Sequence, residues 1–161
     1  MKRLFVFVAK AVLGLVAFSI LWVGAYRFLN RVWRIAGHFE DKIKAASDTY
    51  DVRTLTSEEK ELRRILHVTL QKVTDDLGDR FMFNTAISSI MELVNAFYGF
   101  QESTTVNGGL VREVSLNIIK MLAPFAPHMT EELWSRIVGN GSVHKQRWPQ
   151  YDASAMVQAE V

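Results

Sequence analysis

Apolar residues recur through much of the chain at spacings of three and four, the period of an amphipathic α-helix. One repeat runs over residues 62–77 and a second over residues 83–97. The apolar positions are Leu62, Leu66, Leu70, Val73 and Leu77 in the first repeat and Phe83, Ile87, Ile90, Val94 and Phe97 in the second. No segment of strand length alternates between apolar and polar residues. The pattern therefore predicts an all-α fold, a bundle of four or five amphipathic helices.

Local signals place the ends of these two helices. Thr56 followed by Glu59 matches a capping box, in which the two side chains bond reciprocally to backbone N–H groups. Gly78 is expected to end the first helix. Asn84 or Thr85 is expected to cap the second, because short polar side chains satisfy the first N–H groups of a helix.

The remaining segments are also predominantly helical in pattern. We expect a polar loop over residues 47–55 and a turn at 107–109, where the run Asn-Gly-Gly occurs. A helix over residues 110–122 is expected to end at Pro124. Thr130 then precedes a last helix, which ends in the run Gly-Asn-Gly at 139–141.

The first 26 residues have a different composition. Leu4–Tyr26 contains a single charge, Lys10, and follows the basic start Met1–Arg3. A membrane span needs roughly 20 apolar residues. Two interpretations stay open: a membrane anchor through residues 4–26, or an apolar helix buried in this domain or against another one.

Charge is divided unevenly along the chain. Residues 1–34 carry six basic and no acidic side chains, whereas residues 35–161 carry thirteen basic and seventeen acidic ones, a net charge of −4. An anionic partner is therefore expected at the N-terminal end. The alternative is that the basic flank orients a membrane segment.

Residues 24–46 are amphipathic, with arginines on one side of the predicted helix. Their spacing of four and three lets the guanidinium groups follow a phosphate backbone, although a solvated helix face has the same pattern. The arginines are Arg27, Arg31 and Arg34, called the arginine ridge below, and the apolar positions are Phe28, Val32, Ile35 and Phe39.

Candidate catalytic chemistry is scarce. The chain has no cysteine, its four histidines are far apart, and it has no glycine-rich phosphate loop. Asp75, Asp76 and Asp79 lie close together, but a solvated acidic face accounts for them as well as a cation site does. We therefore predict no catalytic residue and no metal site.

Several blocks of sequence point to a family. They are GAYRFLNRVWR at 24–34, LRR at 62–64, KVTDDL at 72–77, RFMFNTAI at 80–87, MELVN at 91–95, MLAPFAPH at 121–128, TEELW at 130–134 and WPQYD at 148–152. In order and spacing they resemble the leucyl-tRNA synthetases, class I enzymes, and specifically the helical domain that follows the nucleotide-binding core. The resemblance covers about residues 24–157, which leaves residues 1–23 as a separate apolar helix and 158–161 as a tail.

The resemblance implies an anticodon-binding type of helical bundle that grips the body of a tRNA, expected to be leucine tRNA. The arginine ridge coincides with the tRNA-facing region of the family. Arg63, Arg64 and Arg80 are weaker candidates for tRNA contacts, and Arg80 could equally pair with Asp76 or Asp79.

The chain departs from the family in lacking the ATP-site motifs of the His-Ile-Gly-His and Lys-Met-Ser-Lys-Ser types, and the editing domain. No cofactor is therefore expected here; ATP and magnesium would belong to a catalytic domain supplied as a partner. Three explanations stay open: a fragment of a synthetase gene, a stand-alone tRNA-binding module, or a membrane-tethered derivative with a new binding role. The first two imply a cytoplasmic location.

Overall fold

The computed structural model describes residues 23–157, which belong to two compact units, Met1–Arg34 and Ile35–Val161. In the first unit, the described residues 23–34 are helical, and the helical backbone continues to residue 38. The separate apolar helix expected at the N-terminus falls on residues 1–22 and so lies outside the described part. The domain boundary expected at residue 24 stays a prediction.

The second unit is built from helices, and no strand occurs in residues 23–157. The all-α prediction is therefore confirmed. The elements are α2 (Glu40–Ala45), the 3-10 helix η1 (Val52–Thr54), α3 (Ser57–Gly78), α4 (Phe83–Tyr98), α5 (Gly108–Leu122), α6 (Pro127–Val138), the 3-10 helix η2 (Val143–Lys145) and α7 (Ala153–Met156).

Helix α3 begins and ends as its sequence predicts. The Thr56 hydroxyl accepts the Glu59 N–H at 3.2 Å, and a Glu59 carboxylate oxygen accepts the Thr56 N–H at 2.8 Å. This is a complete capping box. Gly78 is the last helical residue. The predicted stripe is buried from Leu62 to Val73, while Leu77 at the end of the helix is half-buried.

Helix α4 differs from the prediction at its start. It begins at Phe83, after Met82, and neither Asn84 nor Thr85 caps it, because both already lie in its first turn. The N–H group of Thr85 bonds instead to the Met82 carbonyl at 3.1 Å. Phe83, predicted to be buried, is 51% exposed at this end of the bundle.

Two other helices begin earlier than predicted. Gly108 and Gly109 open α5 instead of forming a turn, because the side chain of Asn107 caps the helix by accepting the Leu110 N–H at 3.2 Å. Helix α6 begins at Pro127, where a missing N–H and a fixed φ suit the first helical position. Its end at Gly139, with φ 77°, agrees with the prediction.

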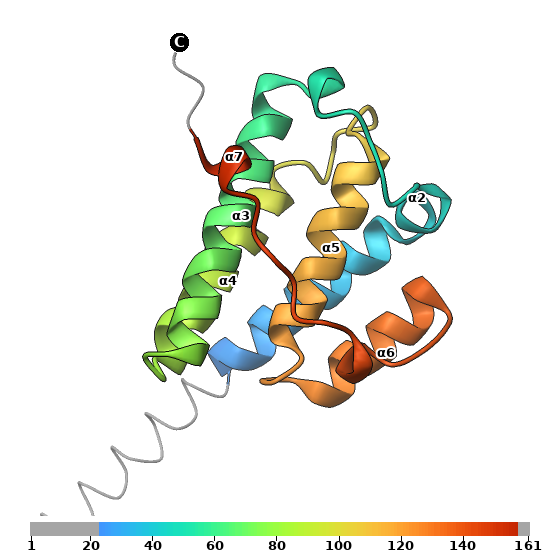
Figure 1. Ribbon diagram of the computed structural model, residues 1–161. Helices are drawn as coiled ribbons and strands as arrows, with labels where there is room; N and C mark the ends of the chain where they lie inside the picture. The colour runs from blue at the N-terminus through green and yellow to red at the C-terminus, as the bar shows by residue number, and fades with distance from the viewer. Residues whose placement is uncertain (1–22, 158–161) are drawn as a thin grey trace, which may run out of the picture. The chain divides into compact units, whose positions relative to one another are not determined.

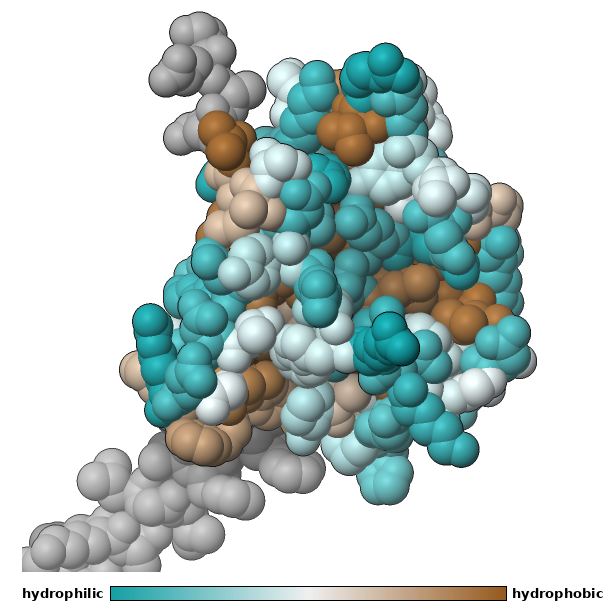
Figure 2. Space-filling model, viewed as in Figure 1, coloured by the Kyte–Doolittle hydropathy of each residue, from teal (hydrophilic) through white to brown (hydrophobic). Residues whose placement is uncertain are grey.

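Helix α5 is central to the second unit. It contacts α2, α3, α4 and α6, while α3 and α4 pack side by side (Figure 1). Its buried positions include Val111, Val114, Ile118 and Met121, as predicted from the sequence. In the same view, most of the surface is hydrophilic, with hydrophobic residues showing in separate small areas (Figure 2).

After α6 the chain returns to α3. From η2 it runs as an extended segment to α7, which packs on α3 (Figure 1). The indole N–H of Trp148 donates to the Thr74 hydroxyl at 2.9 Å. The backbone N–H of Asp152 donates to Nδ1 of His67 at 3.2 Å. These contacts attach residues 146–156, called the returning segment below, to the bundle.

Candidate nucleic-acid interface

The arginine ridge lies on a helix, as its spacing predicts. Arg27, Arg31 and Arg34 are all exposed, and their spacing of four and three places them on one side of helical residues 23–38. Phe28 and Val32, between them in sequence, are buried. The first carboxylate of the chain is Glu40, so the ridge has no acidic neighbour in its own helical segment. Such a face suits phosphate groups, which guanidinium groups bind through paired hydrogen bonds.

Most arginines of the second unit pair with carboxylates. Six of those described there form ion pairs with carboxylates, most of them at hydrogen-bond distance. The pairs are Arg53–Asp51, Arg63–Asp152, Arg64–Glu61, Arg80–Asp76, Arg112–Asp48 and Arg136–Glu40. Their charge is therefore partly neutralised within the unit.

Arg63, one of the predicted tRNA contacts, is engaged inside the protein. Its side chain is only 15% exposed, and its Nη2 donates to the Asp152 carboxylate at 2.8 Å. Its Nε lies 4.0 Å from Glu113. The guanidinium thus joins the returning segment to α3 and α5 and is already engaged with carboxylates inside the protein.

Arg64 and Arg80 remain accessible. Arg64 makes two hydrogen bonds of 2.7 Å to Glu61, one helical turn earlier on α3. The Arg80 side chain is 60% exposed and lies 3.7 Å from Asp76, in agreement with one of the two pairings expected. The pair of Arg64 with the exposed Glu61 is of a kind that contributes little to stability, so a phosphate could replace this carboxylate at low cost. Asp76 is buried, at 1% exposure, so moving Arg80 away from it to a phosphate costs more.

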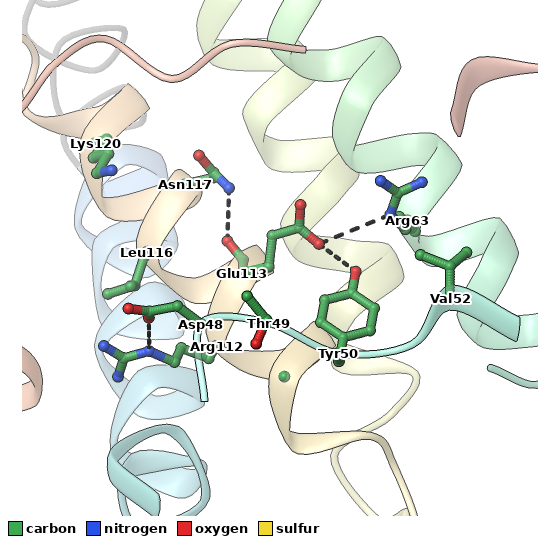
Figure 3. Close-up of a pocket in the computed structure, with 11 residues that line it drawn as sticks. Asp48, Thr49, Tyr50, Val52, Arg63, Arg112, Glu113, Leu116, Asn117 and Lys120 are labelled. Carbon is green, nitrogen blue, oxygen red and sulfur yellow. Dashed lines mark hydrogen bonds and ion pairs between the residues drawn. The ribbon is translucent and has the colours of Figure 1, made fainter. Parts of the chain in front are cut away.

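The described part of the second unit also contains a polar pocket that the sequence analysis missed. It has a volume of about 340 Å³ and lies between α3, α5 and the loop before η1. Figure 3 shows Glu113 of α5 pointing toward Tyr50 and Arg63. The Tyr50 hydroxyl donates a hydrogen bond to Glu113, and His67 Nε2 lies 3.4 Å from the other carboxylate oxygen.

The ionisable groups around Glu113 interact strongly with one another. Burial raises the pKa of Glu113, but hydrogen bonds from His67 and Tyr50 and the charges of His67 and Arg63 lower that pKa below its ordinary value overall. Burial and the adjacent carboxylate raise the pKa of Tyr50. At neutral pH, Tyr50 is therefore a protonated donor to an ionised Glu113. The arrangement is suited to holding α5, α3 and the loop together.

Comparison with known proteins identifies the bundle. Residues 59–161 match the sequence model of the anticodon-binding domain of tRNA ligases. The chain belongs to this family.

A solved structure agrees with that assignment to the anticodon-binding domains. The chain is similar to the agnB2 leucyl-tRNA synthetase (LeuRS) of Agrobacterium radiobacter K84, solved in a ternary complex with tRNA and LeuAMS. The similarity has a TM-score of 0.74 at 29% sequence identity and covers 83% of this chain. The resemblance to the helical domain of leucyl-tRNA synthetases is thus confirmed. The match covers 17% of the length of that synthetase.

Two further findings concern this anticodon-binding domain. Within residues 23–157, no group of three or more His, Asp or Glu side chains is placed to hold a metal ion. Over the same residues, no helix is long and apolar enough to cross a membrane. The membrane segment expected over residues 4–26 lies almost entirely outside the described part of the chain.

Proposed function

We propose that this chain binds tRNA through the arginine ridge and so serves a leucyl-tRNA synthetase as its anticodon-binding domain. The observation that carries the proposal is the ridge itself, three exposed arginines on one helical face. The similar leucyl-tRNA synthetase was solved with tRNA, which supports the same class of ligand for this chain.

Arg64 and Arg80 are proposed as additional contacts. Both are accessible and both lie on or directly after α3. Binding a phosphate there means that the RNA replaces Glu61 or Asp76 as the partner of the arginine, so part of the gain from each contact is lost. Arg63 is left out because Asp152 already holds its guanidinium.

Replacing Arg27, Arg31 and Arg34 together with Glu tests the ridge. The expected result is loss of most affinity for leucine tRNA. The slope of log affinity against log salt should also fall by about two to three, because each phosphate contact releases roughly one counterion. Fluorescence anisotropy over a series of salt concentrations measures both quantities.

A matched control distinguishes the effect of the ridge from the effect of the net charge. Arg53, Lys60 and Lys72 are exposed cations of the second unit, and the triple change to Glu alters the net charge equally. This control should retain more affinity than the ridge variant. Equal losses in the two variants, or unchanged affinity of the ridge variant, would reject the ridge as the binding surface.

We further propose that leucylation is carried out by a catalytic synthetase part outside this chain, in the cytoplasm, and that ATP and magnesium belong to that part. Two observations support this proposal. The match covers only 17% of the similar synthetase, and the two ATP-site motifs do not occur in this sequence. Leucine-dependent exchange between ATP and pyrophosphate should therefore be undetectable with this chain alone. Measurable exchange would overturn this assignment.

A further inference from the structure

The basic side chain of Lys120 takes part in none of the contacts described so far. It lies on α5, two helical turns after Glu113, and Figure 3 shows it at the far end of the polar pocket from Tyr50. It also lines a second pocket of about 190 Å³, together with Arg147 and Trp148 of the returning segment. Lys120 is thus shared by two adjacent hollows of the same surface.

The Lys120 ammonium group has no anionic partner in the described part of the chain. Its Nζ lies 5.7 Å from the centre of the Trp134 ring, a cation–π contact. Burial lowers the pKa of Lys120, and the charge of Asp48 partly opposes this effect. Asp48 is itself bonded to Arg112 at 2.6 Å. A half-buried cation without a hydrogen-bonded anion is well placed to accept one from solution.

The returning segment supplies the other walls of the small pocket. Arg147 is exposed and forms no hydrogen bond or ion pair with residues 23–157. Trp148 is 37% exposed, and its bond to Thr74 holds the indole in place. Residues 144–147 read His-Lys-Gln-Arg without an acidic residue.

The carboxylate of Glu131 lies close to His144, which lines this pocket. Glu131 is 3.8 Å from the His144 ring, and it accepts hydrogen bonds from the Ser142 hydroxyl and the Val143 N–H, both at 3.0 Å. Glu131 is therefore occupied with the turn before the returning segment. Neither Lys120 nor Arg147 is neutralised by it.

We propose that Lys120 and Arg147 bind a phosphate group, that an RNA backbone phosphate is its source, and that the fixed Trp148 ring offers an apolar surface to the adjoining nucleotide. The RNA source rests on the proposed function, since it supposes that the chain binds tRNA. The pocket lies wholly in the second unit, and none of the six arginines considered as tRNA contacts lines it. It would therefore be a phosphate contact additional to the ridge.

The experiment uses the full chain and two ligands, a leucine tRNA transcript and inorganic phosphate. Binding of the tRNA is measured for the wild-type chain, for Arg147→Gln, and for Lys120→Gln combined with Arg147→Gln. The control combines Lys60→Gln with Lys72→Gln, which removes the same charge from exposed positions on α3. The indole N–H resonance of Trp148, assigned by Trp148→Phe, reports phosphate binding in the pocket.

The double variant should lose about tenfold in tRNA affinity, since it removes charged hydrogen bonds, and its salt slope should fall by about two. Arg147→Gln, which changes only an exposed side chain, should lose less tRNA affinity than the double variant. The tRNA affinity of the control should change by less than about twofold. Inorganic phosphate should shift the Trp148 resonance in the wild-type chain and not in the double variant.

Other results separate the two proposals. If tRNA binds wild type and double variant equally, the phosphate site is wrong while the proposed function stands. If tRNA does not bind the wild-type chain but phosphate shifts Trp148, the proposed function fails and the site is a phosphate site of another source. If neither ligand has an effect, both proposals are wrong.

Discussion

Gly109 shows how one residue decides a local packing arrangement. A Cβ at this position would lie 2.7 Å from Cδ1 of the Tyr50 ring and 2.8 Å from its Cβ. The first turn of α5 can therefore approach the loop closely only with glycine. This approach lets the Tyr50 hydroxyl reach Glu113 one turn further along the helix.

Gly109→Ala should destabilise the protein by about 1–3 kcal/mol, the usual cost of inserting a methyl group where no space exists. Gly78→Ala is the control, because a Cβ there meets nothing within 4 Å. It should stabilise α3 by up to about 1 kcal/mol through its higher helix propensity. Urea unfolding of both variants measures the difference. If Gly109→Ala and Gly78→Ala are equally stable, the packing of Tyr50 on α5 does not require glycine at position 109.

At the scale of the element, Glu59 links the start of α3 to the start of α5. One of its carboxylate oxygens accepts the Thr56 N–H at 2.8 Å and the other accepts the Asn107 N–H at 2.6 Å. The residue is buried, at 5% exposure. Two backbone N–H groups from distant loops are thus satisfied by a single side chain.

Thr56→Ala should cost about 1 kcal/mol, as for an ordinary N-cap. Glu59→Ala should cost more, about 2–3 kcal/mol, because it also leaves the Asn107 N–H without its acceptor. Thermal or urea unfolding gives the comparison, with exposed Ser57→Ala as a control near zero. A smaller loss for Glu59→Ala than for Thr56→Ala would contradict this role of the carboxylate.

Elements of this protein were predictable where the deciding signal is local. The capping box of α3 and the stripe from Leu62 to Val73 depend on residues within a few positions, so the sequence reveals both. The start of α5 was mispredicted because Asn-Gly-Gly is typical of turns. What makes it helical is the Asn107 cap and close packing on Tyr50, and only the second of these comes from a distant part of the chain.

The returning segment depends on a contact that a sequence pattern cannot reveal. Arg63 and Asp152 are separated by 89 residues, and no helical period relates them. Hydrogen bonds from Ser154 and Arg63 hold the pKa of Asp152 well below its ordinary value of 3.8. A lowered pKa in the folded state means that this carboxylate stabilises the fold above pH of about 4 and loses that effect as the pH falls further.

Acidification should therefore release the returning segment before the bundle unfolds. Hydrogen exchange of residues 146–156 should increase as the pH falls below about 4, while α3 and α4 stay protected. Asp152→Asn should show faster exchange of that segment already at neutral pH, and less dependence on pH. Equal protection in the variant and the wild type at neutral pH would show that Arg63 does not hold the segment.

Across the whole molecule, fold and candidate site were predictable to different degrees. Helical periodicity and family motifs lie in continuous sequence, so the all-α fold could be predicted. The arginine ridge is also visible, because its three residues share one helix. The pairing of Arg63 with Asp152 and of Tyr50 with Glu113 joins residues 89 and 63 positions apart. Sequence reasoning could not distinguish Arg63, which is 15% exposed and contacts the returning segment, from the neighbouring Arg64, which is 28% exposed.

Direct binding of leucine tRNA to the full chain tests the central claim, measured at about 50 mM and about 200 mM salt. The account predicts binding at the lower concentration that weakens about tenfold or more at the higher one, as expected for three or more phosphate contacts. Absence of binding at low salt, or binding that does not depend on salt, would contradict the assignment of this chain as a tRNA-binding domain.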